Sequence, residues 1–368
     1  MNPFSKFLAS LKKSVLSGPV DQVVGVDIGA SSIKLVELKK KNGRAVLETY
    51  STLALGPYAQ LGVGATTNLS TEILVKALTD ALREGSINAR SAAMAIPSSA
   101  SLVFTVELPP NLSEKDLATI VPTEARKYIP VPISEVSLDY WVIPHRTVEG
   151  DGTAGEVKTE VLVAAIHNET LTKYREIASG AGLDADIFEI ELFSEIRSAF
   201  THELSAVLIM DFGASKTKLA IVEYGIVRVF HIVNRASFDI TTNTATALGV
   251  PFDQAEDIKR NQGLLGGGEM AKASEIARIA CDYILSETAT VIQNFERKYN
   301  KPVSKVILSG AGSLLPGFRE LASEKLRIEV VSGDPFGKVV VPEFVARVLK
   351  DTGPEFSIAL GAALRKLG

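Results

Sequence analysis

A pattern of aspartate, glycine and lysine at fixed spacing occurs twice in this chain. Residues 27–35 read DIGASSIKL and residues 211–219 read DFGASKTKL, so both copies fit Asp-x-Gly-Ala-Ser-x-x-Lys-Leu. Each copy follows a short apolar run, as expected of a buried strand. Two copies of strand, tight turn and strand predict two similar half-molecules facing each other across a cleft. Such a cleft suits a polyphosphate and its metal.

The residue types in both copies favour phosphate and magnesium. Glycine lets a ligand approach the main chain, and successive N–H groups at the turn can form a donor nest for phosphate oxygens. The lysine adds a point charge, and an aspartate ending a buried strand needs a cation or donors, which hydrated magnesium supplies. The predicted phosphate-binding residues are Gly29, Ala30, Ser31, Ser32 and Lys34, with Gly213, Ala214, Ser215, Thr217 and Lys218 in the second copy; the predicted metal ligands are Asp27 and Asp211.

The repetition carries this prediction, because either copy alone is more often a structural turn than a phosphate loop. A fused-repeat structural protein is the alternative, although such a protein would not need two carboxylates at strand ends.

Two other segments would complete a nucleotide site. Residues 309–313 read SGAGS after an apolar strand, and the glycines allow close backbone approach to adenine or ribose. The alternative there is a plain strand-to-helix turn. Glu256 and Lys259, on a predicted helix, form either a surface ion pair or a bracket for a ribose. Neither a Rossmann nor a Walker-type glycine pattern occurs. The predicted contacts from the SGAGS segment are Gly310, Ala311, Gly312 and Ser313.

The elements that hold these residues read as two α/β halves. Both halves begin with hairpin strands, so mixed sheets are expected. The strands expected in the first half are residues 23–28, 33–38, 45–52 and 92–96, and residues 206–233 repeat the three-strand pattern. The main helices are expected over residues 70–84, 192–200, 238–248, 252–260, 269–299, 317–326 and 358–367.

A β-α-β-β-α block between these elements reads as a subdomain inserted into the first half. The predicted units are a tail over 1–20, a first half over 21–98 and 184–203, the insertion over 99–183, a second half over 204–352 with a helical part at about 250–300, and a C-terminal helix over 353–368 that packs on the first half.

Composition excludes several classes of protein. The 368 residues are 46% hydrophobic and 22% charged with a net charge of −4, which indicates about two soluble domains and no nucleic-acid partner. A single cysteine, Cys281, and four scattered histidines exclude a disulfide framework and a thiolate or histidine metal site, and favour a reducing compartment. No apolar run approaches the ~20 residues of a membrane span.

Residues 4–16 form either a short basic amphipathic helix or, as we favour, a mobile tail.

The order of these segments resembles that of the actin, sugar-kinase and chaperone ATPase superfamily. A more specific resemblance lies in residues 124–140, EARKYIPVPISEVSLDY, which are similar to the Glu-Ala-x-x-Tyr-Ile-Pro-x-Pro-Ile-x-Glu-Val-x-x-Asp stretch of PilM, the actin-like family of type IV pilus assembly. Residues 353–365, GPEFSIALGAALR, are similar to the C-terminal signature of that family. The resemblance covers residues 23–365 and implies a duplicated actin-like (ribonuclease H-like) α/β fold, with an inserted subdomain of the type found in the cell-division protein FtsA.

The resemblance also implies ligands and partners. ATP and Mg²⁺ would bind between the halves of a cytoplasmic protein associated with the inner membrane through its partners. The short cytoplasmic N-terminal tail of a PilN-type inner-membrane protein would bind in a groove involving the insertion. Contacts with motor ATPases and the platform protein, and assembly into rings or filaments, are plausible for the family. The second loop lacks the acidic residue of many hydrolysing relatives, so binding with at most slow hydrolysis is expected.

Two alternatives stay open at this stage. One is an FtsA-like filament protein of cell division, although the chain ends directly after the last predicted helix, without a basic membrane helix. The other is a small-molecule kinase of the same superfamily. A kinase needs a carboxylate base over a substrate hydroxyl, and the inserted block offers no evident sugar pocket.

Overall fold

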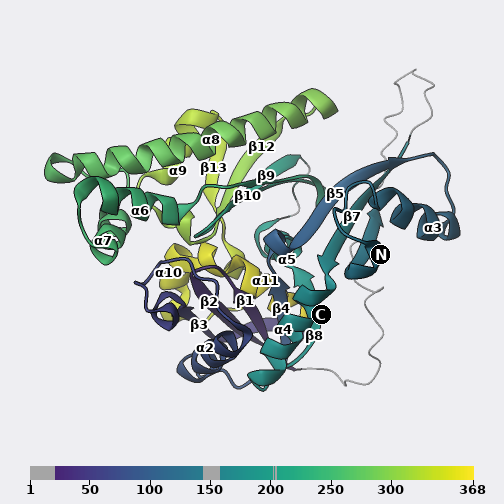
Figure 1. Cartoon of the computed structure of the whole chain (residues 1–368), viewed down its shortest axis with the longest axis horizontal. Coiled ribbons are helices and arrows are strands. Elements are labelled where there is room, and N and C mark those ends of the chain that lie inside the picture. The colour runs from purple at the N-terminus through teal and green to yellow at the C-terminus, as the bar shows by residue number, and fades with distance from the viewer. Residues whose placement is uncertain (1–20, 144–157, 202, 204) are drawn as a thin grey trace.

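Two five-stranded mixed sheets of equivalent strand order form the cores of the two halves (Figure 1). The computed structural model describes residues 21–143, 158–201, 203 and 205–368. The strand orders are β3-β2-β1-β4-β8 and β11-β10-β9-β12-β13. In each sheet an antiparallel three-strand meander continues into parallel strands. The structure thus confirms the two similar α/β halves that the repeated pattern predicted.

The first sheet places the first Asp-x-Gly turn at the end of a central strand. Asp27 of β1 pairs in register with Lys34 of β2. Asn42 and Gly43 join β2 to β3, both with positive φ, which is the conformation that a tight hairpin turn requires. The strands are β1 (Gln22–Ile28), β2 (Ser32–Lys41), β3 (Arg44–Ala54), β4 (Ser91–Ile96) and β8 (Asp184–Ile190).

The second sheet repeats this arrangement. Asp211 of β9 pairs with Lys218 of β10, and Tyr224 and Gly225 form the equivalent positive-φ turn into β11. Each half therefore offers one aspartate and one lysine on adjacent strands. The strands are β9 (Ala206–Phe212), β10 (Thr217–Glu223), β11 (Ile226–Val233), β12 (Val303–Ser309) and β13 (Glu329–Ser332). The sequence analysis missed β13, a four-residue edge strand.

Helices cover both faces of the first sheet. Two helices, α2 (Thr71–Glu84) and α4 (Asn168–Gly180), share one core with it, and the hydroxyl oxygen of Ser70 caps α2 as predicted. On the other face lie α5 (Glu191–Ala199) and α11 (Ser357–Leu367). Their contact is very close, because a Cβ on Gly361 would lie 1.8 Å from the carbonyl oxygen of Ser194. This packing fixes the start of α5 at the floor of the space between the halves.

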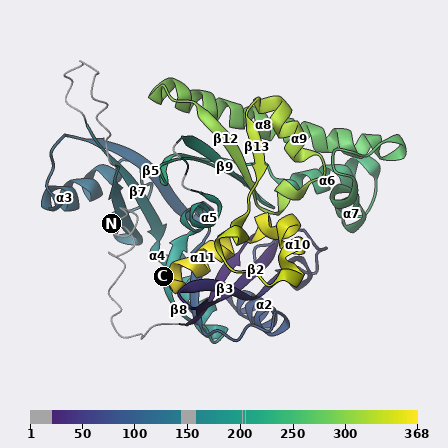
Figure 2. The same ribbon diagram turned by 180° about the vertical axis from the view of Figure 1, so that it is seen from behind.

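The second half carries a helical layer on its outer side. The long helix α8 crosses this side in both views (Figures 1 and 2) and buries Cys281 in the core. The helices of this layer are α6 (Ser237–Leu248), α7 (Phe252–Gln262), α8 (Ala271–Tyr299) and α9 (Phe318–Leu326). A further helix, α10 (Glu343–Thr352), packs instead in a core with Val36 and Leu47 of the first sheet. It was not predicted, although its apolar residues recur at helical spacing.

The insertion is a separate antiparallel sheet of order β5-β7-β6. Its elements are β5 (Ser101–Leu108), α3 (Glu114–Ala125), β6 (Val136–Val142) and β7 (Thr159–His167). Although α4 falls within the predicted inserted unit, it packs in the core of the first half through Leu171, Tyr174 and Ile177. The predicted tail over 1–20 lies outside the described residues.

The insertion also touches the second half. Arg228 of β11 donates hydrogen bonds to Glu223 of β10 and to Glu160 of β7, at 3.0 and 3.1 Å. All three side chains are largely buried. The inserted sheet is therefore held by an ion-pair network as well as by apolar contacts.

Candidate functional site

A cavity of about 630 Å³ lies between the two halves and collects nearly all the predicted site residues. Both Asp-x-Gly-Ala-Ser turns line it, together with both lysines of the repeat and the loop after β12. The predicted residues on its wall are Asp27, Gly29, Ala30, Ser31, Ser32, Lys34, Asp211, Gly213, Ala214, Ser215, Lys218, Glu256, Lys259, Gly310, Ala311 and Gly312.

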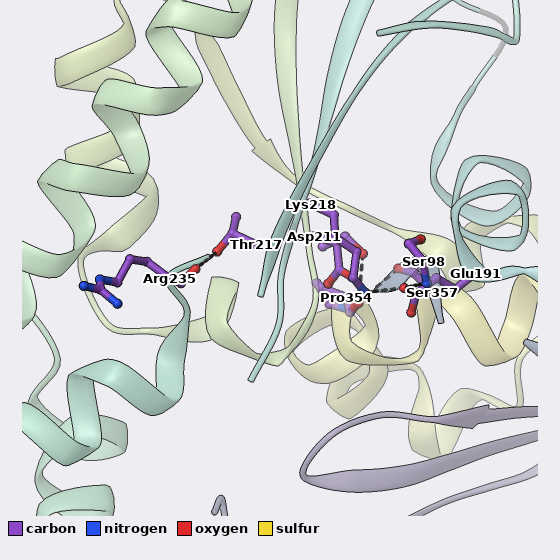
Figure 3. Close-up of polar contacts among 9 residues, drawn as sticks. Ser98, Glu191, Asp211, Thr217, Lys218, Arg235, Pro354 and Ser357 are labelled. Carbon is purple, nitrogen blue, oxygen red and sulfur yellow. Dashed lines mark hydrogen bonds and ion pairs between the residues drawn. The ribbon is translucent and has the colours of Figure 1, made fainter. Parts of the chain in front are cut away.

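Two predicted contacts do not line the cavity. Thr217 is fully buried, and its hydroxyl donates to the backbone carbonyl of Arg235 at 2.8 Å (Figure 3). The hydroxyl of Ser313 turns back to the carbonyl of Gly310 at 2.6 Å. Both hydroxyls stabilise the loops rather than face the cavity.

The two aspartates occupy equivalent positions but have different partners. Asp27 is 6% exposed, and burial raises its pKa to about 6, although the ammonium of Lys34 opposes the rise. Lys34 itself donates to the hydroxyl of Ser32 at 3.0 Å. Asp211 instead accepts a hydrogen bond from Lys218 at 2.7 Å. Among the described residues, Asp27 is thus a buried carboxylate without an ion pair to a lysine or arginine, which is the condition expected of a metal ligand.

Lys218 joins the two halves. Besides Asp211 of the second half, its ammonium contacts Glu191 at the start of α5 in the first half, at 2.8 Å (Figure 3). Although burial alone lowers the pKa of Lys218, the carboxylates of Asp211 and Glu191 raise it well above its usual value. Glu191 is further fixed by the backbone N–H of Ser98, at 2.6 Å. Lys218 is therefore a permanent cation that bridges carboxylates across the floor of the cavity.

A second buried glutamate, Glu195, lies one helical turn beyond Glu191. Burial raises its pKa well above the usual value, and the charge of Asp211 adds to the rise. One carboxyl oxygen of Glu195 has no hydrogen-bond partner within the described part of the chain. A neutral Glu195 relieves the concentration of negative charge made by Asp27, Glu191 and Asp211.

The repeated turns expose backbone donors, though fewer than the sequence suggested. The N–H of Gly29 donates within its turn to Ser32, and that of Gly213 to Lys216, at 3.0 and 3.2 Å. Neither glycine adopts a positive φ. A Cβ there would lie 3.2 and 2.9 Å from those acceptor oxygens, so close packing rather than unusual φ favours glycine. Among the described residues, no hydrogen bond occupies the N–H groups of four alanines and serines of the turns, namely Ala30, Ser31, Ala214 and Ser215.

The glycines after β12 are required by the protein's own packing. Gly310 has a φ of 78°, and a Cβ on it would lie 2.2 Å from the carboxylate of Asp211. A Cβ on Gly312 would lie 2.6 Å from the carbonyl oxygen of Phe212. The N–H of Gly310 donates to the carbonyl of Pro354, which also accepts from the hydroxyl of Ser357 (Figure 3). These contacts hold the loop of the second half against the segment that leads into α11.

Glu256 and Lys259 form a buried ion pair, not a surface one, at 2.7 Å. Glu256 also accepts from the hydroxyl of Thr241 at 2.6 Å and from Arg260 at 2.7 Å. Burial opposes ionisation of Glu256, but Lys259, Thr241 and Arg260 together lower its pKa. The carboxylate is therefore ionised and preorganised to accept from hydroxyl groups in the cavity.

Some residues of the cavity were missed by sequence reasoning. Glu191, Lys173 and Tyr174 line it, and Glu195 lies behind it. Two glutamates four residues apart in an otherwise buried helix were a usable signal, because buried carboxylates are rare without a role. Nothing local marked Lys173 or Tyr174, which lie on an ordinary amphipathic helix.

The donor set fits a nucleotide phosphate with a hydrated magnesium ion. Asp27 offers a buried carboxylate that no lysine or arginine of the described chain pairs with, and the turns offer open amide donors. Among the described residues no cluster of three or more histidine, cysteine or acidic side chains forms a metal site. That is consistent with Mg²⁺, which binds to one or two carboxylates and completes its shell with phosphate and water.

Comparison with known proteins agrees with this arrangement. A solved structure described as a PilM-PilN type IV pilus biogenesis complex superposes with a TM-score of 0.80 and 24% identity, over 95% of this chain and 100% of that one. MreB5 of Spiroplasma citri bound to ADP superposes with a TM-score of 0.52 and 11% identity, over 94% of this chain and 96% of that one. The fold and the cavity define a protein of the actin-like class.

Sequence comparison identifies a more specific family within this class. The family model of the type IV pilus assembly protein PilM matches residues 25–367, and the chain belongs to that family. The cell division protein FtsA of Pseudomonas aeruginosa is 25% identical over 224 residues, which are 55% of this chain and 53% of that protein. The chain thus aligns with about half the length of this curated relative. Throughout the described residues, no helix has the length and apolar character needed to cross a bilayer.

Proposed function

We propose that this protein is an ATP-binding scaffold of type IV pilus assembly, which binds ATP and Mg²⁺ between its halves. The observation that carries the proposal is the meeting of both repeated turns and both strand-end aspartates in one cavity. The PilM family membership and the ADP-bound MreB5 of similar fold support it.

In this proposal the residues have distinct roles. The free N–H groups of the two turns donate hydrogen bonds to the phosphate chain, while Lys34 supplies a positive charge from β2. Asp27 is the ligand for the hydrated metal. Glu256 accepts from ribose hydroxyls, and the loop around Gly312 lies against the adenine. Magnesium, when bound, would neutralise phosphate charge and compensate the buried Asp27.

Binding is better supported than turnover. Glu191, the carboxylate at the start of α5, is held by Lys218 and by the N–H of Ser98. An ion-paired carboxylate is a weak base, so rapid proton abstraction from water is not expected there. We therefore propose that the bound nucleotide orders the two halves relative to each other, since a ligand that prefers one state shifts the population toward it.

The nucleotide site is tested by titrating ATP with and without Mg²⁺. Asp27→Ala and Gly213→Asp should each abolish binding. Asp184→Ala, on the exposed end of β8, and Gly267→Asp, where added atoms meet open space, are matched controls that should bind normally. All four variants should unfold cooperatively on heating. Retained affinity in both site variants would refute the site.

We further propose that the insertion binds the N-terminal cytoplasmic peptide of a PilN-type inner-membrane protein. Such a contact would associate this chain peripherally with the inner membrane. The PilM family membership supports this proposal, as does the PilM-PilN complex of similar fold. The insertion exposes Tyr128, which is 53% accessible and stacks on Phe104 with ring centroids 4.9 Å apart. An exposed aromatic pair of this kind suits an apolar peptide side chain.

Deletion of the whole insertion is unsuitable as a test, because residues 99–183 include α4 of the first-half core. Tyr128→Ala is the sharper variant, with Tyr283→Ala on α8 as an equally exposed aromatic control. The Tyr128 variant should weaken binding of a synthetic PilN-type N-terminal peptide about tenfold, as expected of a central aromatic anchor. Equal peptide affinity in the two variants would show that Tyr128 does not contact the peptide. Contacts with motor ATPases or the platform protein, and assembly into rings, stay part of the proposal.

A further inference from the structure

We propose that the cavity contains a second anion subsite, formed by Lys173 and Tyr174 of α4, that takes a small oxyanion of the phosphate class. The subsite rests on the proposed function, because it lies next to the phosphate-binding turns. It is distinct from the turns themselves, since it belongs to a helix of the first half outside the repeated pattern.

The first observation is an ammonium without a counter-ion. Five lysines line the cavity. Four of them have polar side-chain partners: Lys34 has Ser32, Lys216 has Asn234, Lys218 has Asp211 and Lys259 has Glu256. Lys173 is partly buried, and no side chain or carbonyl among the described residues pairs with it. A partly desolvated cation at a cavity wall is stabilised by an anion that binds there.

The second observation is the tyrosine next to Lys173, whose hydroxyl no group of the described chain pairs with. Tyr174 is 7% exposed and lines the cavity, and no hydrogen bond joins its hydroxyl to any other part of the described chain. Burial raises the pKa of Tyr174 strongly, and the charges of Glu191 and Asp27 add to the rise. The neutral hydroxyl is therefore available as a donor near those two carboxylates. Because Tyr174 lines the cavity, its hydroxyl can donate a hydrogen bond to an oxyanion that binds there.

The position of α4 sets this subsite apart from the nucleoside end. The helix lies on the first half, whereas α7, which carries Glu256 and Lys259, lies on the second half and on the opposite side in both views (Figures 1 and 2). Ser99 and Asn68, both exposed, line the same cavity from the first half. The subsite thus lies where a terminal or released phosphate group would be, beyond Asp27.

The local charges permit an anion there. Glu191 is paired with Lys218, and Lys34 acts on Asp27. Once a divalent cation neutralises Asp27, Lys173 leaves a positive excess on this side of the cavity. The occupant is either the terminal phosphate of bound ATP or free inorganic phosphate, since both present the same oxygens to Lys173 and Tyr174.

Calorimetric titrations separate these sources. Inorganic phosphate is titrated into the protein alone and into its Mg²⁺–ADP complex, and ATP and ADP are titrated separately. The variants are Lys173→Met, Tyr174→Phe and, as a matched control, Lys76→Met on the exposed face of α2. Lys173→Met should lower the affinity for phosphate or for ATP about tenfold, as expected for loss of a charge-assisted contact. Tyr174→Phe should lower it about threefold, and ADP affinity should stay constant throughout.

The outcomes separate the two proposals. Loss of ATP affinity alone assigns the subsite to the terminal phosphate, and loss of phosphate affinity assigns it to the free anion. The subsite is refuted if both variants bind phosphate and ATP with affinities within twofold of wild type. It is also refuted if the wild-type protein binds neither phosphate nor ATP. A wild-type protein that binds neither ATP nor ADP refutes the nucleotide proposal, and the phosphate titration on the protein alone then decides the subsite.

Discussion

Replacement of the buried aspartate of the first turn should stabilise the protein while removing its metal site. Asp27 is ionised at neutral pH only at a cost, because burial raises its pKa from 3.8 to about 6. Each pKa unit corresponds to about 1.4 kcal/mol. Asp27→Asn should therefore increase the free energy of unfolding by about 3 kcal/mol at pH 8, in EDTA and without nucleotide.

The sign of the pH dependence follows from proton binding. Between pH 4 and 6 the folded wild-type protein keeps the proton of Asp27, whereas the unfolded chain loses it, so this group lowers wild-type stability as the pH rises. The difference between Asp27→Asn and wild type should thus be close to zero near pH 4, grow through pH 6 and stay constant above. Urea unfolding at four pH values between 4 and 8 measures it.

The equivalent aspartate of the second turn provides the control. Asp211 is paired with Lys218 at 2.7 Å in a buried site. Asp211→Asn removes one of the two carboxylates that pair with Lys218 and should destabilise the protein by about 2 kcal/mol, the usual cost of losing a hydrogen bond between charged groups, since Glu191 still pairs with the ammonium. Two symmetry-related substitutions should therefore act in opposite directions. A loss of stability in Asp27→Asn at pH 8, or a gain that does not shrink toward pH 4, would refute the reasoning.

Three other predictions concern close contacts. Gly361→Ala should destabilise the protein by more than about 3 kcal/mol in urea unfolding, because the new Cβ would lie 1.8 Å from the carbonyl oxygen of Ser194. Gly267→Ala is the control, since its Cβ would meet open space, and should leave the free energy of unfolding nearly unchanged. Gly64→Val should speed nucleotide dissociation in stopped-flow measurements, because its Cβ would lie 2.7 Å from the carboxylate carbon of Glu256, the proposed ribose contact. Gly182→Val is the control: Gly182 also has a positive φ, but a Cβ there meets no other atom, so the dissociation rate should not change. Arg228→Met should cost about 3 kcal/mol and increase hydrogen exchange in β5, and unchanged exchange would show that apolar contacts alone hold the insertion.

The sequence predicted the architecture well where local patterns decide structure. The repeated pattern with its apolar runs located the central strands, and Asn42-Gly43 marked a hairpin turn that the structure contains. The edge strand β13 was missed because a four-residue strand gives a weak periodic signal. The helix α10 was missed although its apolar residues recur at helical spacing. PilM family membership, first indicated by residues 124–140 and 353–365, was confirmed by the family model.

The site was predicted by residue type but not by pairing. Glu256 and Lys259 were expected either on the surface or at a ribose, and the structure makes them a buried network with Thr241 and Arg260. The glycines after β12 were assigned to ligand approach, whereas the nearest atoms to their missing side chains belong to Asp211 and Phe212. For these glycines the atoms that matter belong to a strand far away in the sequence, which no local window contains.

By itself, the sequence determined that each half presents an aspartate, a tight turn and a lysine on adjacent strands, because turn chemistry and strand register depend on neighbouring residues. Tertiary structure alone decided that the two copies differ. Lys218 pairs with Glu191 of the opposite half, whereas Lys34 donates to Ser32, and among the described residues Asp27 is buried without an ion pair. The physical reason is that charge–charge energies depend on burial and on which elements lie against each other, and these are set only when the two halves pack together.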